Sequence, residues 1–143
     1  MLGAIVGDMV GSIYEAKPIK TKDFRLFGKG VTFTDDTICT VAIADSLLAG
    51  GDFAASLRAW VRRHPDRGYG AMFRRWALSD GMPAYGSWGN GSAMRVSPVA
   101  YAAPDLSNVI PNQVCSDISG IAKKRILLSR RRCRMSIYFP GLV

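Results

Sequence analysis

Residues 33–48 read FTDDTICTVAIADSLL, and the fold predicted for this chain is built around them. Their apolar residues recur at the spacing of a helix, and Gly50-Gly51 follows as a suitable C-terminal stop. The pattern therefore predicts a largely buried helix over residues 35–48.

The entry to this helix carries two adjacent carboxylates, Asp35 and Asp36, between two threonines. Like charges repel, so either a helix terminus or a cation must offset the cost. A helix N-terminus would use Thr34 as its cap and would favour each aspartate by roughly 0.3–1 kcal/mol. A hydroxyl and carboxylates are also the oxygen ligands that Mg²⁺, Ca²⁺ or Mn²⁺ prefer. These residues alone leave both interpretations open.

The flanking segments repeat the helical pattern. A first helix is predicted over residues 2–13. Asp52 is suited to cap a third, which ends before Pro65. A fourth is predicted over residues 71–78, and the chain can return to helix from Ser92. No convincing two-residue alternation is present, so the fold class is all-α.

Three glycines, Gly3, Gly7 and Gly11, share one stripe of the first helix. Each costs up to about 1 kcal/mol relative to alanine, so the close approach of another helix is expected there. A dinucleotide-binding loop is disfavoured because the spacing is GxxxGDxxG and no strand precedes it. Asp8, beside Gly7, is expected to hydrogen-bond a neighbouring loop.

Two irregular segments are candidates for binding. Residues 14–32 form a long polar loop, and residues 80–98 combine four glycines with aromatic and apolar residues, as expected of a shaped binding loop. Tyr69 and Tyr85 are suited either to stack on an adenine or to anchor the packing. His64 is expected to lie at a solvated helix end.

Composition places limits on the class of protein. The 143 residues fit one domain with a net charge of +8, and no apolar run approaches the roughly 20 residues that cross a bilayer. The N-terminal stretch lacks a basic region and carries Asp8, so a cytoplasmic location is predicted. Three cysteines at unrelated spacings support neither a disulfide framework nor a zinc site, and Cys39 is expected to be a small buried hydrophobe.

The C-terminal part is distinctly basic. Residues 123–134, KKRILLSRRRCR, hold seven basic residues among twelve. Such a run can contact nucleic acid or an anionic membrane through phosphates. No recognition motif accompanies it, so neither specific nucleic-acid binding nor a membrane partner is expected.

Four blocks in order, GAIVGDMVGSIYE, FTDDTICTVAIADSLL, WVRRHPDRGYG and SWGNGSAMRVSPVA, resemble the ADP-ribosylglycohydrolase family, which includes dinitrogenase reductase-activating glycohydrolases and ADP-ribosylhydrolases. The resemblance covers residues 2–103, so residues 1–104 are expected to form the N-terminal part of such a domain. It implies an all-α bundle and a pair of Mg²⁺ or Mn²⁺ ions. It also implies cleavage of the bond between the ribose anomeric carbon of ADP-ribose and a side chain or small group. The expected partner is an ADP-ribosylated protein or a small ADP-ribose derivative.

The resemblance also assigns residues. Metal ligands would be Thr34, Asp35 and Asp36, and the catalytic groups would be Asp35, Asp36 and Glu15, the last matching a glutamate on a mobile loop. The ADP-ribose cleft would be lined by the glycine-rich segment Gly89, Asn90, Gly91 and Ser92, with Met94 and Arg95 after it and Trp88 as a wall. Metal-bound oxygen groups would orient the ribose hydroxyls for an oxocarbenium-like transition state, while bare glycine amides can approach a diphosphate.

The sequence departs from the family pattern towards its C-terminus. Family members are roughly twice as long and complete the metal site with a second aspartate motif, whereas Asp105 and Asp117 are isolated here. The correspondence weakens after Pro104 and ends near Ser119. One hypothesis is that residues 105–143 include a tail from a shifted reading frame, which sequencing of the locus would test.

Three interpretations follow: a metal-dependent hydrolase, an inactive ADP-ribose-binding module, or a truncated nonfunctional fragment. A homodimer that covers exposed apolar faces is compatible with each.

Overall fold

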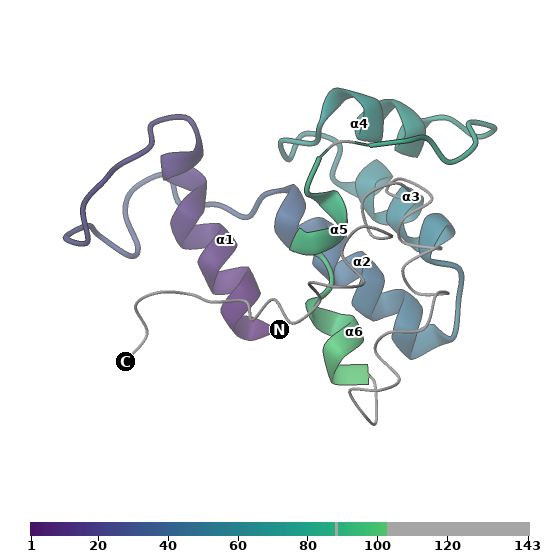
Figure 1. Ribbon diagram of the computed structural model, residues 1–143, viewed down its shortest axis with the longest axis horizontal. Coiled ribbons are helices and arrows are strands. Elements are labelled where there is room, and N and C mark those ends of the chain that lie inside the picture. The colour runs from purple at the N-terminus through teal and green to yellow at the C-terminus, as the bar shows by residue number, and fades with distance from the viewer. Residues whose placement is uncertain (88, 103–143) are drawn as a thin grey trace, which may run out of the picture.

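A computed structural model describes residues 1–87 and 89–102, and within them every regular element is a helix (Figure 1). The helices are α1 (Leu2–Glu15), α2 (Asp35–Ala49), α3 (Phe53–Arg63), α4 (Ala71–Leu78), α5 (Gly91–Met94) and α6 (Ser97–Ala102). The all-α class is confirmed. Trp88 and residues 103–143, including the basic run, lie outside the described residues.

The ends of the central helices follow local chemistry. Asp52 Oδ1 accepts a hydrogen bond from the Ala54 amide at 2.7 Å, which caps α3 as predicted. Gly50 takes the left-handed conformation, with φ of 61°, and ends α2 one residue later than expected. Helix α1 extends two residues beyond its predicted end at Ile13. Glu15 is therefore the last residue of a helix, whereas the family resemblance implied a loop.

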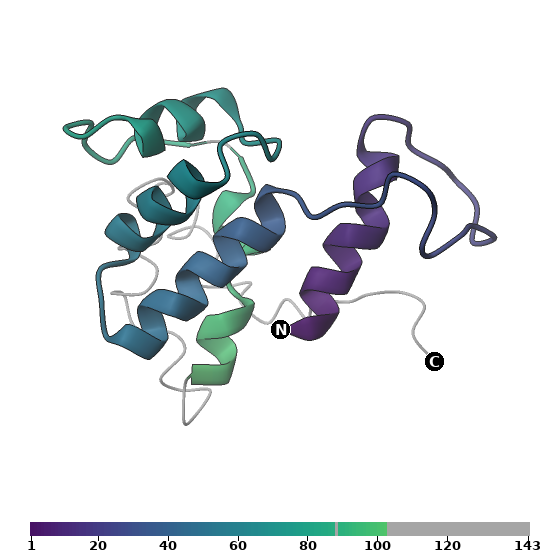
Figure 2. The same cartoon turned by 180° about the vertical axis from the view of Figure 1, so that it is seen from behind.

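The core is organised around α2, which packs against α3 and α6, while α4 packs on α3 (Figure 2). Its members are apolar side chains from these helices and from the turn before α4: Ile38, Cys39, Ala42, Ile43, Leu57, Val61, Tyr69, Trp76, Ala77 and Val99. Cys39 is completely buried, so its predicted role as a small core residue is confirmed.

Helix α1 stands at one side of this core and contacts it through α2 (Figure 1). A Cβ added to Gly3, Gly7 or Gly11 would meet no described heavy atom within 4 Å. The expectation of a close helix neighbour along this stripe is therefore wrong for the described residues. Helix α1 is attached to α2 by polar contacts from Asp8, and the glycines permit a close approach along their stripe without requiring one.

The structure also places the aromatic residues that were singled out. Tyr69 is 8% exposed and donates a hydrogen bond to the His64 carbonyl at 2.8 Å, so it anchors the core and is not available to an adenine. Tyr85 packs, partly buried, against the same core. His64 does end α3, but its ring packs against Phe33 and Trp60 and is only partly solvated.

Among the described residues, no helix combines the length and apolar character that crossing a bilayer requires.

Candidate functional site at the start of α2

Asp8 joins α1 to the first turn of α2. Asp8 is 9% exposed, and its carboxylate accepts hydrogen bonds from the Thr34 amide at 2.8 Å and the Thr37 amide at 3.2 Å. The hydroxyls of both threonines donate to the same carboxylate. Asp8 was expected to hydrogen-bond a neighbouring loop, and its partners are instead the N-cap and the first turn of α2. The two threonines that flank the aspartates therefore hold this buried charge.

The capping interpretation of the segment is also supported. Thr34 is the N-cap of α2, and its Oγ1 accepts from the Asp36 amide at 3.4 Å. This long hydrogen bond satisfies one of the free amides of the first turn. Capping uses the threonine hydroxyl, however, and leaves both aspartate carboxylates free for another role.

The carboxylates of Asp35 and Asp36 accept no hydrogen bond from another described side chain and take part in no ion pair with a described residue. Burial, followed by repulsion from Asp36, raises the pKa of Asp35 to about 6. Burial and then Asp8 raise the pKa of Asp36. Negative charge at the start of α2 is therefore poorly compensated.

Glu15 belongs to the same cluster although it is twenty residues away in sequence. Its pKa is raised by partial burial and then by repulsion from Asp8 and Asp36. We call Asp8, Glu15, Asp35 and Asp36 the acidic cluster. Glu15 thus lies within electrostatic reach of Asp35 and Asp36, the other two residues that the family resemblance marked as catalytic.

The glycine-containing third block of the sequence also meets this cluster. Gly68 has a φ of 88°, and a Cβ placed on it would lie 3.6 Å from Asp35 Oδ1. The Gly68 backbone therefore lies against this carboxylate in a conformation that other residues rarely adopt. Sequence analysis did not assign Gly68, and the RGYG turn was the available signal.

The acidic cluster offers the type of ligand atom that a divalent cation prefers. Carboxylate oxygens are the ligands that Mg²⁺ and Mn²⁺ prefer, and uncompensated charge at Asp35 and Asp36 favours a cation there. Yet no three acidic, histidine or cysteine side chains among the described residues are arranged to hold a metal ion. Asp35 and Asp36 would be ligands, and further oxygen ligands would have to complete the coordination.

The glycine-rich segment packs on α2 farther along its length. Helix α5 begins at Gly91, and the Ala93 amide donates to the Asn90 carbonyl at 2.8 Å. Thr40, on α2, donates to the Met94 carbonyl at 3.3 Å. The segment and the acidic cluster therefore share one supporting helix. The predicted cleft residues Gly89 and Ser92 belong to this segment, whereas Trp88 is outside the described residues.

Arg95, which the family resemblance assigned to the cleft lining, is instead buried. It is 2% exposed, and its Nε and Nη1 atoms have no hydrogen-bond partner among the described residues. Its guanidinium lies 5.0 Å from the Phe73 ring centre. Its charge partly offsets the effect of burial, which raises the pKa of the Cys39 thiol to about 12. A Cβ on Gly91 would lie 3.1 Å from Arg95 Nη2, so a glycine suits that position.

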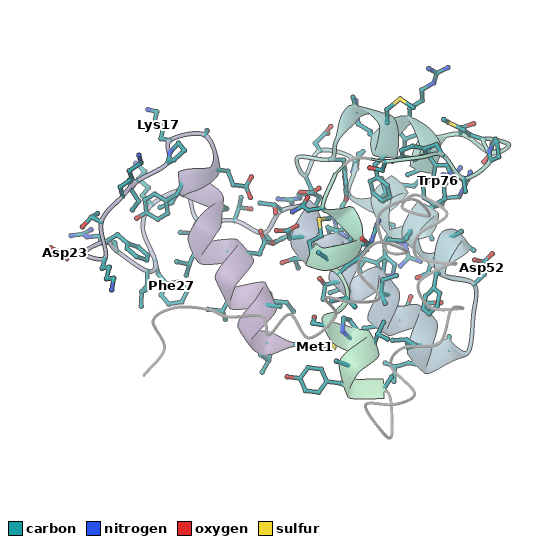
Figure 3. All side chains as sticks on the ribbon, viewed as in Figure 1. Met1, Lys17, Asp23, Phe27, Asp52 and Trp76 are labelled. Carbon is teal, nitrogen blue, oxygen red and sulfur yellow. The ribbon has the colours of Figure 1, made fainter. Side chains whose placement is uncertain are left out.

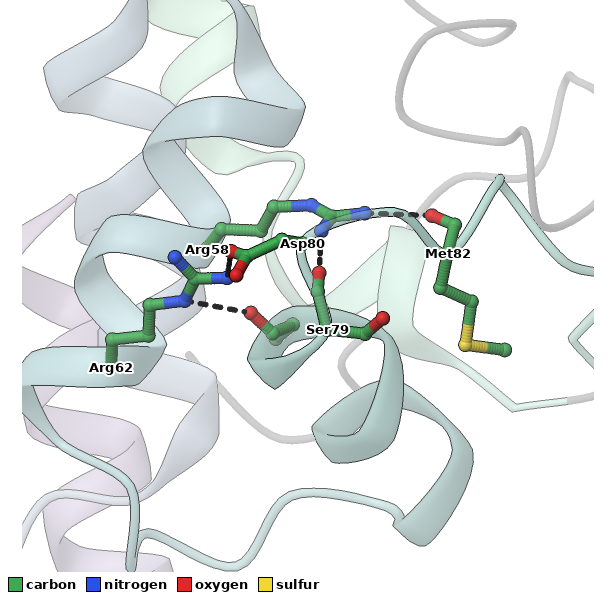
Figure 4. A network of polar contacts seen from close by, with 6 residues as sticks. Arg58, Arg62, Ser79, Asp80 and Met82 are labelled. Carbon is green, nitrogen blue, oxygen red and sulfur yellow. Dashed lines mark hydrogen bonds and ion pairs between the residues drawn. The ribbon is translucent and has the colours of Figure 1, made fainter.

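Two arginines of α3 position the chain where it leaves α4 (Figure 4). Arg58 donates to the Ser79 carbonyl and, at 2.7 Å, to the Met82 carbonyl. Arg62 donates to the Ala77 carbonyl at 3.2 Å and pairs with Asp80 at 2.6 Å. These contacts fix the start of the loop that leads to the glycine-rich segment.

Replacing Asp35 with asparagine is expected to stabilise the fold at neutral pH. Because the folded pKa is raised to about 6, folding favours the protonated acid, and this contribution is lost as pH rises from about 4 to about 6. Asp35→Asn should therefore raise the free energy of unfolding by about 1 kcal/mol at pH 7, after allowance for solvent screening, and by almost nothing at pH 4.

Urea unfolding between pH 4 and pH 8 without divalent ions measures this difference. Asp23→Asn, which changes an exposed acid on the preceding loop, is the matched control. A gain in stability from Asp35→Asn that does not grow with pH would show that folding does not raise the pKa of Asp35.

Residues 1–119 match the family model described as ADP-ribosylglycohydrolase, and the chain belongs to this family. It is 30% identical over 140 residues to ADP-ribosylhydrolase ARH3 of Xenopus tropicalis, an alignment that covers 77% of this chain and 40% of that protein. The proteins of the same name from Mus musculus and Homo sapiens are 29% and 28% identical over 144 residues, covering 76% of this chain and 39% and 40% of theirs. The chain thus spans about two fifths of the length of these relatives. No solved structure matches it.

Proposed function

We propose that this chain carries part of the metal-dependent centre of an ADP-ribosyl hydrolase, which cleaves the glycosidic bond between ADP-ribose and an acceptor side chain or small group. The observation that supports it best is the acidic cluster, in which Asp35 and Asp36 are close together, partly buried and without a cationic partner. Family membership and the name of the relatives support the same reaction.

In this proposal the residues have distinct roles. Asp35 and Asp36, with Thr34, would hold Mg²⁺ or Mn²⁺, of which the family resemblance implies two. When bound, such ions polarise the ribose hydroxyls and an attacking water. Asp8 does not serve as a ligand, because its carboxylate is occupied by the two threonines and fixes the ligand-bearing turn instead. Glu15, at the end of α1 and within electrostatic reach of the pair, is suited to orient the water.

The glycine-rich segment supplies the binding half of the proposed site. Backbone amides around Gly89 and Gly91 can approach a diphosphate because glycines carry no side chain of their own, although the Gly89 amide donates to Ser87 Oγ in this structure. The proposed partner is an ADP-ribosylated protein or a small ADP-ribose derivative, in the cytoplasm. A homodimer would cover exposed apolar residues such as Leu2 and Leu48, which are 80% and 90% exposed.

Hydrolysis of ADP-ribosyl-arginine and ADP-ribosyl-serine, assayed with and without Mg²⁺, tests the proposal. Turnover should require the metal and fall by about 100-fold or more in Asp36→Ala. Asp45→Ala, an exposed acid on the same helix, should retain activity. Metal-independent turnover, or turnover that survives loss of Asp36, would contradict the assignment.

A second candidate function is an ADP-ribose-binding module without turnover. It is favoured by the finding that fewer than three metal-binding side chains converge among the described residues. Calorimetry with ADP-ribose distinguishes the hydrolase from the binding module. Binding without hydrolysis supports the module. Binding that weakens when Asp36 is replaced would still assign the metal to this site.

A further inference from the structure

The chain between α1 and α2, residues 16–33, forms a loop that projects from the edge of the molecule (Figures 1 and 2). In both views most of it lies on the side of α1 that faces away from α2, and its last part crosses α1 to reach α2. Lys17, Asp23 and Phe27 mark its start, outer part and return (Figure 3). We call residues 16–33 the projecting loop. Its shape is convex, so it offers a tip and no enclosing groove.

The base of the projecting loop is held by the last turns of α1. Tyr14 donates to the Arg25 carbonyl at 3.3 Å, and its ring meets that of Phe24 edge-on at 5.5 Å. Where the loop returns towards α2, the Thr32 amide donates to Ser12 Oγ at 3.2 Å. These contacts give the loop a defined position while they leave most of its side chains uncovered.

Positive charge is concentrated in the projecting loop. It carries five basic residues and one acid, Asp23, for a net charge of +4. The basic residues are Lys17, Lys20, Lys22, Arg25 and Lys29. The other described residues hold seven basic and eight acidic side chains, for a net charge of −1. No ion pair with a described residue neutralises a loop cation.

The same loop exposes apolar side chains between its cations. Ile19 is 42% exposed, Leu26 57% and Phe27 66%. Phe24 is 40% exposed although it contacts Tyr14. Uncovered apolar groups that alternate with lysines are costly in water and typical of segments that meet another surface.

We propose that the projecting loop docks this protein on an anionic lipid surface, with Leu26 and Phe27 entering the interface and the lysines facing the headgroups. Such a surface offers hydrocarbon and negative charge together, and the loop offers exposed apolar side chains and positive charge to match them. A flat partner also suits a convex tip, because it requires no matching cavity.

Other anionic partners fit these observations less well. Single-stranded nucleic acid gains from stacking on aromatic rings, which Phe24 and Phe27 offer, but it gains little from the aliphatic side chains of Ile19 and Leu26. A bidentate phosphate or carboxylate site would favour arginine, whereas four of the five cations are lysines, which act as point charges. The expectation of no membrane partner concerned spanning segments and the basic run, and docking at a surface needs neither. The proposal is independent of hydrolase activity.

Co-sedimentation of the full chain with phosphatidylcholine vesicles, with and without about one third phosphatidylserine, tests the proposal. Binding should require the anionic lipid and weaken with salt. Replacing Lys17, Lys20 and Lys22 with glutamine should reduce the affinity by about 100-fold, since each cation near a membrane contributes about 1 kcal/mol. Leu26→Ser with Phe27→Ser should reduce it by at least about tenfold.

Matched controls use exposed residues elsewhere. Leu2→Ser with Leu48→Ser removes two exposed apolar side chains outside the loop and should change the affinity less than about twofold, as should Arg75→Gln for charge. Circular dichroism checks that each variant is folded. Failure to bind anionic vesicles overturns the proposal, as does binding that the loop variants retain, which would assign it to another part of the chain. Preference for a single-stranded oligonucleotide or an acidic peptide over vesicles also overturns it.

Discussion

Replacing Asp8 with alanine is expected to lower the free energy of unfolding by about 3–5 kcal/mol. The carboxylate accepts hydrogen bonds from two amides and two hydroxyls at the start of α2, and it is almost completely buried. Alanine would leave these donors without an acceptor and would remove the main polar attachment of α1. Because small domains are stable by only about 5–15 kcal/mol, the variant should be close to unfolding.

Urea unfolding monitored by circular dichroism measures this loss. Asp45→Ala is the control, since Asp45 is exposed and accepts one hydrogen bond, from Trp60 Nε1 at 2.9 Å, and its loss should cost less than about 1 kcal/mol. Asp8→Asn keeps the size but presents an amide group to donors, so it should cost about 2 kcal/mol or more. Equal effects of Asp8→Ala and Asp45→Ala would show that Asp8 does not hold the turn.

Replacing Arg95 with methionine is expected to raise the free energy of unfolding by about 1–3 kcal/mol. The guanidinium is removed from water, and two of its nitrogen atoms find no acceptor among the described residues. Methionine retains much of the apolar stem and its contact with Phe73 without carrying the charge. The loss of the interaction with the Phe73 ring is smaller than the desolvation that is relieved.

Thermal and urea unfolding measure the gain, with Arg75→Met on the exposed side of α4 as control, expected within about 0.5 kcal/mol of the parent chain. Gly91→Ala supplies a second test, because its new Cβ would lie 3.1 Å from Arg95 Nη2. Its cost should be smaller in the Arg95→Met background, as a double-mutant cycle would show. A destabilised Arg95→Met protein would instead indicate that the guanidinium has an acceptor and is structural.

The helices were accessible to sequence analysis because their signals are local. The bounds of α2, α3 and α4 follow from apolar spacing, from the Asp52 cap and from Gly50, all of which act within a few residues. Thr34, Asp35 and Asp36 were identified for the same reason, because they are consecutive in the sequence and lie at the start of one predicted helix. Family membership followed from four such blocks together and is confirmed.

Contacts between distant segments could not be obtained in this way. Local pattern indicated that Asp8 bonds a neighbouring segment, but only packing of α1 against α2 identifies Thr34 and Thr37 as its partners. A glycine stripe predicted a close helix, yet the described structure leaves Gly3, Gly7 and Gly11 open. The reason is that small residues permit a close approach without requiring one.

Helical class, helix ends and the acidic entry of α2 are consequences of neighbouring residues, because hydrogen bonding and side-chain spacing in a helix extend over only a few positions. The acidic cluster and the burial of Arg95 arise from folding in three dimensions. Charge repulsion and desolvation depend on which side chains share a space, and Glu15 reaches Asp36 only when α1 packs beside α2.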